Sequence, residues 1–377
     1  MDSQSLFLFV AGSILPSFVV ALLATYLVRR NADRWGLVDL PNERKVHTTP
    51  TPRGGGLAVW LAVVGAFAAL QIVVLLRENP VVSELIPKFA QGYLAGIAFQ
   101  FPKLWILLAG GTALTLLGLM DDRGGLSWQL RLLIEFVVAI VCVWLVPNLR
   151  LTAFVDLPLL TGALSVLWIV ALINAFNMLD NMDGLSAGVA AIAAVVLAAV
   201  MLLGPNPKSV GPQLFVAGLL LVLVGSLLGF LWHNRPPARI FMGDSGAYFV
   251  GFTIAAATLL ASYTSYQSTT RHAILAPLCV MAVPLYDMAT VILIRLYNGK
   301  SPFAADKNHF SHRLVDLGMT KAQAVLTIYL TTATCGLGAL VLHRTDAIGA
   351  ILIMLLIGCV LGLIGILETT ARRTIKK

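Results

Sequence analysis

The chain has 377 residues, of which 58% are hydrophobic and 12% charged, and its formal net charge is +8. Soluble domains carry about 25% charged residues, so this composition excludes an ordinary soluble protein and indicates several membrane spans. The apolar runs are continuous rather than alternating, which favours helices over a β-barrel.

Eleven segments are candidates for membrane-spanning helices, each of which needs about 20 mostly apolar residues. They are residues 5–28, 55–76, 104–120, 131–147, 160–176, 185–203, 212–232, 246–263, 272–296, 322–342 and 347–368. The N-terminus lacks the basic region and cleavage site of a signal peptide, so we expect the first segment to be retained. We therefore expect an all-α fold: a polytopic helical integral membrane protein with about eleven transmembrane helices and a single domain over residues 1–377.

The distribution of basic residues predicts the orientation in the membrane. If the N-terminus lies outside, 19 of the 26 Lys and Arg residues fall in inside segments and 7 in outside segments. The positive-inside rule then favours an N-out, C-in topology. Because these charges flank membrane spans, we expect them to meet lipid headgroups or phosphorylated substrates, and we expect no nucleic acid partner.

The first inside loop, residues 29–54, is basic and rich in proline. Arg44, Lys45, His47 and Arg53 are candidates for binding an anionic headgroup or a diphosphate. Anchoring by the positive-inside rule explains the arginines equally well, so both readings stay open.

Two neighbouring aspartates, Asp121 and Asp122, close the third apolar segment at its inside mouth, and Arg131 follows in the first turn of the fourth. Carboxylates at a membrane face are costly unless they are paired or bind a metal, and one of them could act as a general base. The alternative is a plain turn in which aspartate serves turn chemistry.

A polar stretch between two apolar runs, Asn174–Gly188 (NAFNMLDNMDGLSAG), places Asn174, Asn177, Asp180 and Asp183 three residues apart. In a helix this spacing brings side chains near one face. Carboxylate and amide oxygens are hard ligands, which suit Mg²⁺ or a sugar nucleotide better than Zn²⁺. A polar loop with helix caps is the alternative.

Two further aspartates follow. Asp244 stands just before the eighth segment, after the polar loop HNRPPARIFMGDSG, and is placed as a metal ligand or a helix cap. The GDSG sequence is not the G-x-S-x-G pattern of a serine hydrolase. Asp287 lies inside the ninth segment, where an ionisable group indicates a functional site or a polar residue at a helix break. Pro284 predicts a kink three residues before it.

The last inside loop, residues 297–321, carries His309 and His312 beside Arg313. Two histidines three apart could form half of a metal site, but no cysteine or third histidine accompanies them. Binding of phosphate or sugar is therefore the preferred interpretation, and an interfacial loop without function is the alternative.

These polar groups all fall on the same predicted side of the membrane. A transporter would be expected to place its polar groups near the midplane, in broken helices. Their position at the inner face favours an enzyme that acts on a membrane lipid with a cytosolic substrate.

The segments MDDRGGLS, NAFNMLDNMDGLSAG, NRPPARIFMGDSGAYFVG and GKSPFAADKNHFSHRL, in this order, resemble the polyprenyl-phosphate N-acetylhexosamine-1-phosphate transferases, most closely the WecA/TagO type. The first loop, VDLPNERKVHTTPTPRGGG, is similar to the basic first loop of that family. The resemblance covers residues 33–320, with two further helices and a basic tail in 321–377.

The resemblance implies an enzyme that moves a sugar 1-phosphate from a UDP-N-acetylhexosamine to polyprenyl (undecaprenyl) phosphate with Mg²⁺, or Mn²⁺ as a substitute, and releases UMP. It implies a bacterial inner (plasma) membrane location among membrane lipids, with the active site facing the cytoplasm. Homodimer formation is left open.

By the same resemblance, the catalytic residues are Asp121, Asp122, Asp180 and Asp183, and the metal ligands are Asn177 and Asp244. The implied substrate-binding residues are Lys45, His47, Arg131, Asn174, Asn234, His309, His312 and Arg313. A phosphate nucleophile has a pKa near 6 and needs little deprotonation at pH 7, so Asp121 and Asp122 act either as a base or in positioning the lipid phosphate.

One position departs from the family pattern. Many relatives read H-x-H-H-R in the last loop, whereas Ser311 stands where the middle histidine is expected. The exact sugar and the downstream polymer therefore stay open. The alternatives are an MraY-type phospho-N-acetylmuramoyl-pentapeptide transferase, whose histidine triplet is missing here, and a membrane transporter with an inner-face anion site.

Overall fold

The computed structural model describes residues 2–39, 50–151, 155, 157–204, 212–263, 270–304, 306 and 308–375, with side chains up to Glu368. Over these residues the elements are α1 (Ser3–Asn31), β1 (Val38–Asp39), β2 (Thr51–Pro52), α2 (Gly55–Leu75), α3 (Pro80–Leu85), α4 (Lys88–Gln91), α5 (Leu94–Gly124), α6 (Trp128–Leu145), η1 (Pro147–Leu149), α7 (Pro158–Leu179), α8 (Leu185–Leu203), α9 (Leu214–Asn234), α10 (Gly243–Leu260), η2 (Arg271–Leu275), α11 (Ala276–Val280), α12 (Ala282–Tyr297), α13 (Phe310–Asp316), α14 (Lys321–Leu342) and α15 (Ala347–Ile375). The all-α prediction is confirmed.

Each of the eleven apolar segments contains helix. Within the described residues, nine helices are long and apolar enough to cross a membrane, and a bent pair raises the number to ten. The pair, Arg271–Val280 and Ala282–Tyr297, bends by 63° at Met281, three residues before Pro284, as predicted. The remaining segment is α10, whose first turn carries Asp244 and which is not among the candidate spans. The expected number of about eleven spans therefore exceeds the nine or ten that the described helices give by their length and composition.

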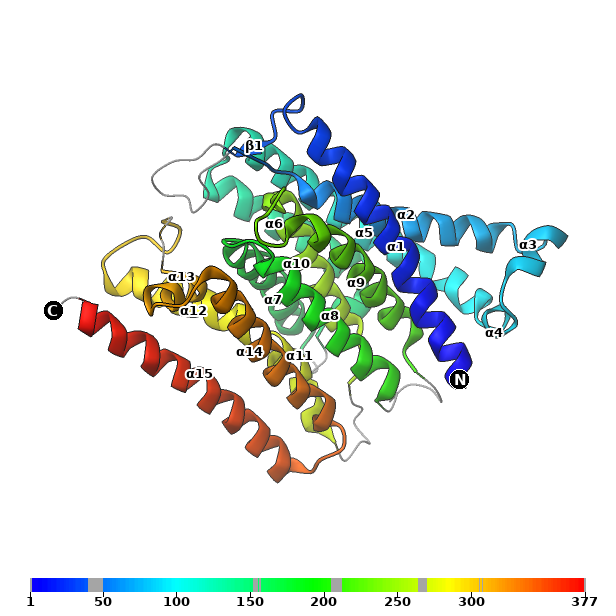
Figure 1. The fold of residues 1–377 in the computed structure, drawn as a ribbon. Coiled ribbons are helices and arrows are strands. Elements are labelled where there is room, and N and C mark those ends of the chain that lie inside the picture. Colours follow the sequence, from blue (N-terminus) through cyan, green and yellow to red (C-terminus); the bar gives the residue numbers. More distant parts are fainter. Residues whose placement is uncertain are drawn as a thin grey trace.

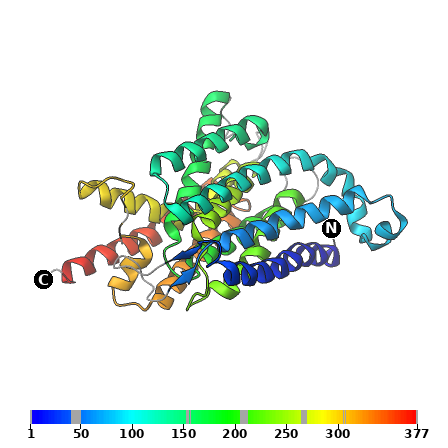
Figure 2. The same cartoon turned by 90° about the horizontal axis from the view of Figure 1, so that it is seen from above.

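The helices form one bundle in which α8, α9 and α10 lie innermost (Figures 1 and 2). Helices α1 and α2 pack beside α9, and α14 packs beside α8. Helix α15 runs along the edge of the bundle next to α14 (Figure 1). The segment 77–103 contains α3, α4 and the start of α5. Pro80 occupies the first turn of α3 and Asn79 caps it, which is why a helix forms there.

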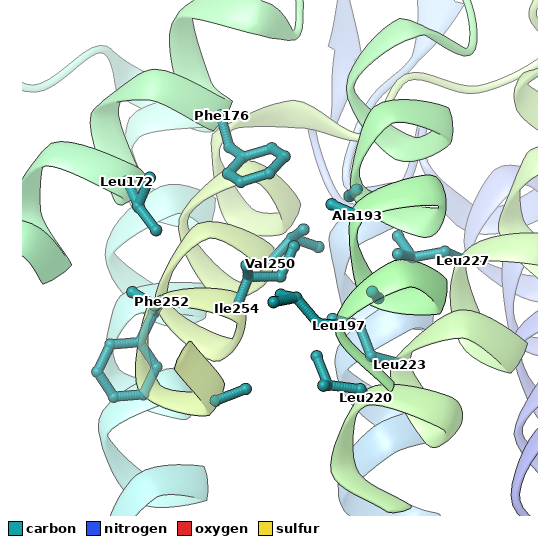
Figure 3. Packing of buried hydrophobic residues seen from close by; sticks show 14 of the residues in the cluster. Leu172, Phe176, Ala193, Leu197, Leu220, Leu223, Leu227, Val250, Phe252 and Ile254 are labelled. Atoms are coloured by element: carbon teal, nitrogen blue, oxygen red, sulfur yellow. The ribbon is translucent and has the colours of Figure 1, made fainter. Parts of the chain in front are cut away.

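Large aliphatic and aromatic side chains from α7 to α10 fill the centre of the bundle (Figure 3). Phe176 of α7, Leu197 of α8, Leu223 of α9 and Ile254 of α10 are each no more than 1% exposed. This packing fixes the ends of α7 and α10, from which several polar residues project.

Glycines allow α2, α5 and α10 to touch backbone to backbone. A Cβ at Gly56 would overlap the backbone of Gly246, and one at Gly118 would overlap the backbone of Ser245. Because any side chain would separate these helices, the start of α10 is held rigidly beside the end of α5.

A short ribbon joins the first loop to the loop before α10. Strands β1 and β2 are antiparallel, with Val38 opposite Pro52. The Phe241 amide donates to the Pro52 carbonyl at 2.8 Å, and the Gly55 and Gly56 amides donate to the Phe241 and Met242 carbonyls at 3.0 Å each. Two segments nearly 200 residues apart therefore form one backbone unit.

Candidate active site

A cavity of about 400 Å³ lies where the polar loops meet, within the size range of small-molecule sites. Its lining comes from separate stretches of the chain: Asp39, Arg53, Asp122, Asp180, Asn181, Met182, Asp183, Asn234, Pro236, Phe241, Gly243, Asp244, Asp306, His309, His312, Lys321 and Val325. The sequence-predicted residues Asp122, Asp180, Asp183, Asn234, Asp244, His309 and His312 are thus brought together. We refer to Asp122, Asp180, Asp183 and Asp244 as the acidic cluster.

The neighbouring aspartates Asp121 and Asp122 have different surroundings. The Asp121 carboxylate accepts the Leu126 amide at 2.6 Å and pairs with the Arg131 guanidinium at 2.7 Å, and the Tyr248 hydroxyl lies 3.3 Å away. Neither Asp121 nor Arg131 lines the cavity, whereas Asp122 does. Arg131 therefore serves as the partner of Asp121 in this structure, and Asp122 is the one exposed to a ligand.

The start of α10 holds Asp122 in place. The backbone amides of Asp244 and Ser245 donate to its two carboxylate oxygens at 3.1 and 3.3 Å. Gly243 precedes them with φ +72°, and a Cβ there would lie 2.6 Å from the nearer oxygen of Asp122. Only glycine combines this backbone conformation with the space the carboxylate needs. The amides at this helix N-terminus thus orient the carboxylate of Asp122.

The other members of the acidic cluster are also oriented by local contacts. The Asn177 side-chain amide donates to Asp244 at 2.6 Å, and the Ala238 amide donates to Asp183 at 2.9 Å. Asp180 lies in the turn that ends α7. Burial, followed by the charge of Asp122, raises the pKa of Asp180 to about 7.

The donor atoms at this end of the cavity suit Mg²⁺ in kind. Asp122, Asp244 and the amide of Asn177 offer hard oxygen ligands in adjacent positions. No group of three or more His, Cys, Asp or Glu residues in the part of the chain that the structure describes is arranged to hold a metal by itself. This is compatible with Mg²⁺, which commonly takes one or two carboxylates together with waters and substrate phosphates.

Asn174 and Asn234 have their hydrogen bonds within the protein. The Asn174 amide donates to Glu135 of α6 at 2.5 Å and to the Val170 carbonyl at 2.9 Å, and Asn174 does not line the cavity. Asn234 lines it, but its side chain accepts the Gly184 amide at 3.0 Å and donates to the Ile240 carbonyl at 2.8 Å. Asn234 therefore joins the loop that carries Asp180 and Asp183 to the loop before α10.

The two histidines of the last loop also line the cavity. The Nδ1 atom of His309 lies 3.0 Å from the buried carboxylate of Asp287, which also accepts the Phe310 amide at 2.5 Å. Asp287 thereby fixes the ring of His309, and the interpretation of Asp287 as a functional residue gains a geometric basis. The His312 ring lies 6.2 Å from that of His309. We refer to His309 and His312 as the histidine pair.

Arg313 differs from its predicted place. Its side chain is 3% exposed, does not line the cavity and forms an ion pair with Glu368 of α15 at 2.9 Å. Consecutive residues of a helix point about 100° apart, and in α13 it is His312 that faces the cavity while Arg313 faces away from it. Ser311, which departs from the family pattern, is buried and donates a hydrogen bond to Asn181 of the loop after α7.

Arg53 of the first loop, predicted as a candidate for binding an anionic headgroup or a diphosphate, lines the cavity and pairs with Asp39 at 2.5 Å. Asp39 also lines the cavity and was not among the predicted site residues. Lys321 and Asp306 line it as well. The PRGGG motif that contains Arg53 belongs to a loop whose basic character is clear from the sequence. The position of Lys321 beside the cavity depends on tertiary packing, which the sequence does not show. Lys45 and His47 lie outside the described residues.

Taken as a class, the chain is a multi-pass helical membrane protein with an acidic cavity at one end of its bundle. The family model for Glycosyl transferase family 4 matches residues 104–262. The chain is 33% identical to the probable undecaprenyl-phosphate N-acetylglucosaminyl 1-phosphate transferase of Bacillus subtilis, over 87% of this chain and 85% of that protein.

Two further relatives agree. The decaprenyl-phosphate N-acetylglucosaminephosphotransferase of Mycobacterium tuberculosis is 35% identical, over 86% of this chain and 80% of that protein. The undecaprenyl-phosphate alpha-N-acetylglucosaminyl 1-phosphate transferase of Escherichia coli K12 is 27% identical over 86% of this chain and 81% of that protein. The chain therefore belongs to Glycosyl transferase family 4, among the polyprenyl-phosphate N-acetylhexosamine-1-phosphate transferases that its motifs resemble.

Proposed function

We propose that the protein transfers N-acetylglucosamine 1-phosphate from UDP-N-acetylglucosamine to a polyprenyl phosphate, releasing UMP and forming a polyprenyl-diphosphate-linked sugar. The observation that carries the proposal is the cavity itself, in which the acidic cluster, the histidine pair and Arg53 all meet. The names of the similar proteins support the choice of donor and acceptor.

The chief obstacle to this reaction is repulsion between the lipid phosphate and the donor diphosphate. Mg²⁺ held at Asn177 and Asp244 would supply charge neutralisation. Asp122, which the amides at the start of α10 hold in place, orients the ligands on the same side. Arg53, held at 2.5 Å by Asp39, supplies a guanidinium suited to phosphate oxygens.

The histidine pair supports the donor side of the cavity. The Asp287 carboxylate holds Nδ1 of His309, which leaves Nε2 as the atom available to a ligand. His309 and His312 each donate a hydrogen bond to the sugar or the diphosphate. This agrees with the binding of phosphate or sugar expected for the last loop. Asp183 and Asp180 face the same space and serve the nucleotide side.

The proposed setting is a bacterial plasma membrane with the cavity at the cytoplasmic face, the N-terminus outside and the C-terminus inside. The split of 19 inside and 7 outside Lys and Arg residues supports it. Reporter fusions at the two ends test it, since two ends that report the same compartment would contradict this topology.

The function is tested by incubating purified protein with polyprenyl phosphate and a panel of donors. We expect UMP release with UDP-N-acetylglucosamine, loss of release in EDTA, and recovery with added Mg²⁺ or Mn²⁺. Release only with UDP-N-acetylmuramoyl-pentapeptide would favour the MraY-type activity. No release with any donor would contradict the transferase and favour the transporter.

A further inference from the structure

The side chain of Arg313 lies at a junction of four segments behind the histidine pair. Its Nη1 donates to the Asn308 carbonyl at 2.9 Å, and its Nη2 donates to the Thr290 hydroxyl of α12 at 3.0 Å. Its Nε forms the 2.9 Å ion pair with Glu368 of α15. One cation therefore joins the loop before His309, the helix that carries Asp287, α13 and the last helix.

An aromatic residue completes the junction. The Tyr286 hydroxyl donates to the same Glu368 oxygen at 3.1 Å, and the guanidinium of Arg313 lies 5.8 Å from the centre of the Tyr286 ring. The edge of that ring meets Phe310, the first residue of α13, at 5.6 Å between ring centres. Phe310 follows His309 directly, so the junction contacts the residue next to the histidine pair.

Glu368 is the group that compensates the charge of Arg313. The two side chains are 6% and 3% exposed, so neither charge has much water around it. Removing one partner of a buried pair leaves the other charge uncompensated, and the remaining group is driven to find a new partner. Two other carboxylates of the α12–α13 region already have partners of their own, because Asp287 contacts His309 and Asp306 pairs with Arg295.

Helix α15 lies at the edge of the bundle next to α14 (Figure 1). Much of it is exposed, including Leu352, Leu356 and Leu363. Its packing is with α14, α13 and η2, and Glu368 lies at the end next to α13. A carboxylate on the last helix is therefore in contact with the segment that carries the histidine pair, though it does not itself line the cavity.

We infer that Glu368 is a positioning residue for the donor side of the active site: it holds Arg313 behind α13, and this fixes His309 and His312 at the cavity. The inference rests on the proposed function, and it gives Arg313 a role different from direct binding of the donor.

The test is donor kinetics of the Glu368→Gln protein. We expect the KM for UDP-N-acetylglucosamine to rise by roughly tenfold, the change that about 1.4 kcal/mol of lost binding produces. The kcat and the KM for polyprenyl phosphate stay near those of the unchanged protein, because the acidic cluster is untouched. Glu368→Asp recovers part of the loss. Cys359→Ser, an exposed change on the same helix, is the matched control and leaves all constants unchanged.

A double variant separates positioning from direct binding. Arg313→Gln alone leaves Glu368 buried without a partner and raises the donor KM. Because the two residues act through one contact, Arg313→Gln with Glu368→Gln should raise the donor KM no further than the single variants do. If the two losses add, Arg313 acts on the donor independently of Glu368 and the inference is wrong. If Glu368→Gln alone does not fold, Glu368→Asp takes its place in this comparison.

Failure of the inference is distinct from failure of the proposed function. An unchanged protein that releases no UMP contradicts the function. An active protein whose donor KM is unaffected by Glu368→Gln, or whose kcat alone falls, contradicts only the role of Glu368.

Discussion

The acidic cluster and the histidine pair line one cavity, but they are held in different ways. Asp122 is fixed by backbone amides at the start of α10, where glycines let helices touch directly. His309 is fixed by a side chain, Asp287, and its neighbours are fixed by the pairs of Arg313 with Glu368 and Arg295 with Asp306. Backbone contacts cannot adjust by changing rotamers, whereas side-chain pairs can be removed one at a time.

The difference teaches that the two parts of the site should respond differently to substitution. Changes at the acidic cluster should act on turnover, because this part holds the charges proposed to lie nearest the phosphates. Each substitution around the histidine pair should have a smaller effect, because several separate side-chain contacts hold these two histidines in place.

The largest effect is expected for Asp244→Asn. Loss of this charge removes a proposed Mg²⁺ ligand, and we expect turnover to fall by about a thousandfold, which corresponds to about 4 kcal/mol in the barrier. The Mg²⁺ concentration for half-maximal UMP release should rise. Asp33→Asn, an exposed carboxylate outside the cavity, is the control. Near-normal turnover at limiting Mg²⁺ would exclude Asp244 as a ligand.

The next effect tests the backbone contact. In Gly243→Ala the new Cβ would lie 2.6 Å from the Asp122 carboxylate, and we expect turnover to fall by about a hundredfold, as displaced catalytic groups commonly cause. Gly299 has a similar φ of +65° but open space around it. Gly299→Ala therefore measures backbone strain alone. Equal losses in the two proteins would show that the clash with Asp122 is unimportant.

A smaller effect is expected for Asp287→Asn. Hydrogen bonds to charged groups contribute about 1.5–3 kcal/mol, so we expect kcat/KM to fall by roughly ten- to a hundredfold. If Asp287 acts through His309, the same substitution should add little in a His309→Ala protein. Fully additive losses would mean that Asp287 has a role of its own.

The smallest effect concerns stability and pH. Burial opposes ionisation of Asp306, but hydrogen bonds from Arg295 and Asn308 outweigh it and lower the pKa of Asp306 to about 2. Its ionised form therefore stabilises the fold above its ordinary pKa of 3.8, and this stabilisation is lost as the pH falls toward 2.

Thermal unfolding in detergent measures this contribution. Asp306→Asn should lower Tm at pH 7, and the difference from the unchanged protein should shrink as the pH is reduced below 3.8. A difference that is constant over this range would show that the charge of Asp306 does not matter.

The acidic cluster was largely predictable from sequence, because each of its aspartates follows or precedes an apolar run and so marks a helix end. The histidine pair was predicted for a different reason, the spacing of two histidines beside Arg313 in the polar loop 297–321. The direction of Arg313 was not predictable, because it depends on Glu368, which lies 55 residues further along the chain. Likewise, the different surroundings of Asp121 and Asp122 follow from Arg131 and Tyr248, whose approach is set by the packing of α6 and of α10 against α5.

The close approach of α2, α5 and α10 also bears on how such an enzyme can diverge. At Gly56 and Gly118 any larger residue would collide with backbone, so single substitutions there have no compensating neighbour. In the region around α13 many single substitutions should be tolerated, since each contact there is a separate side-chain pair. New donor preferences in an evolving lineage would accordingly be expected to arise around α13, while the acidic cluster keeps its geometry.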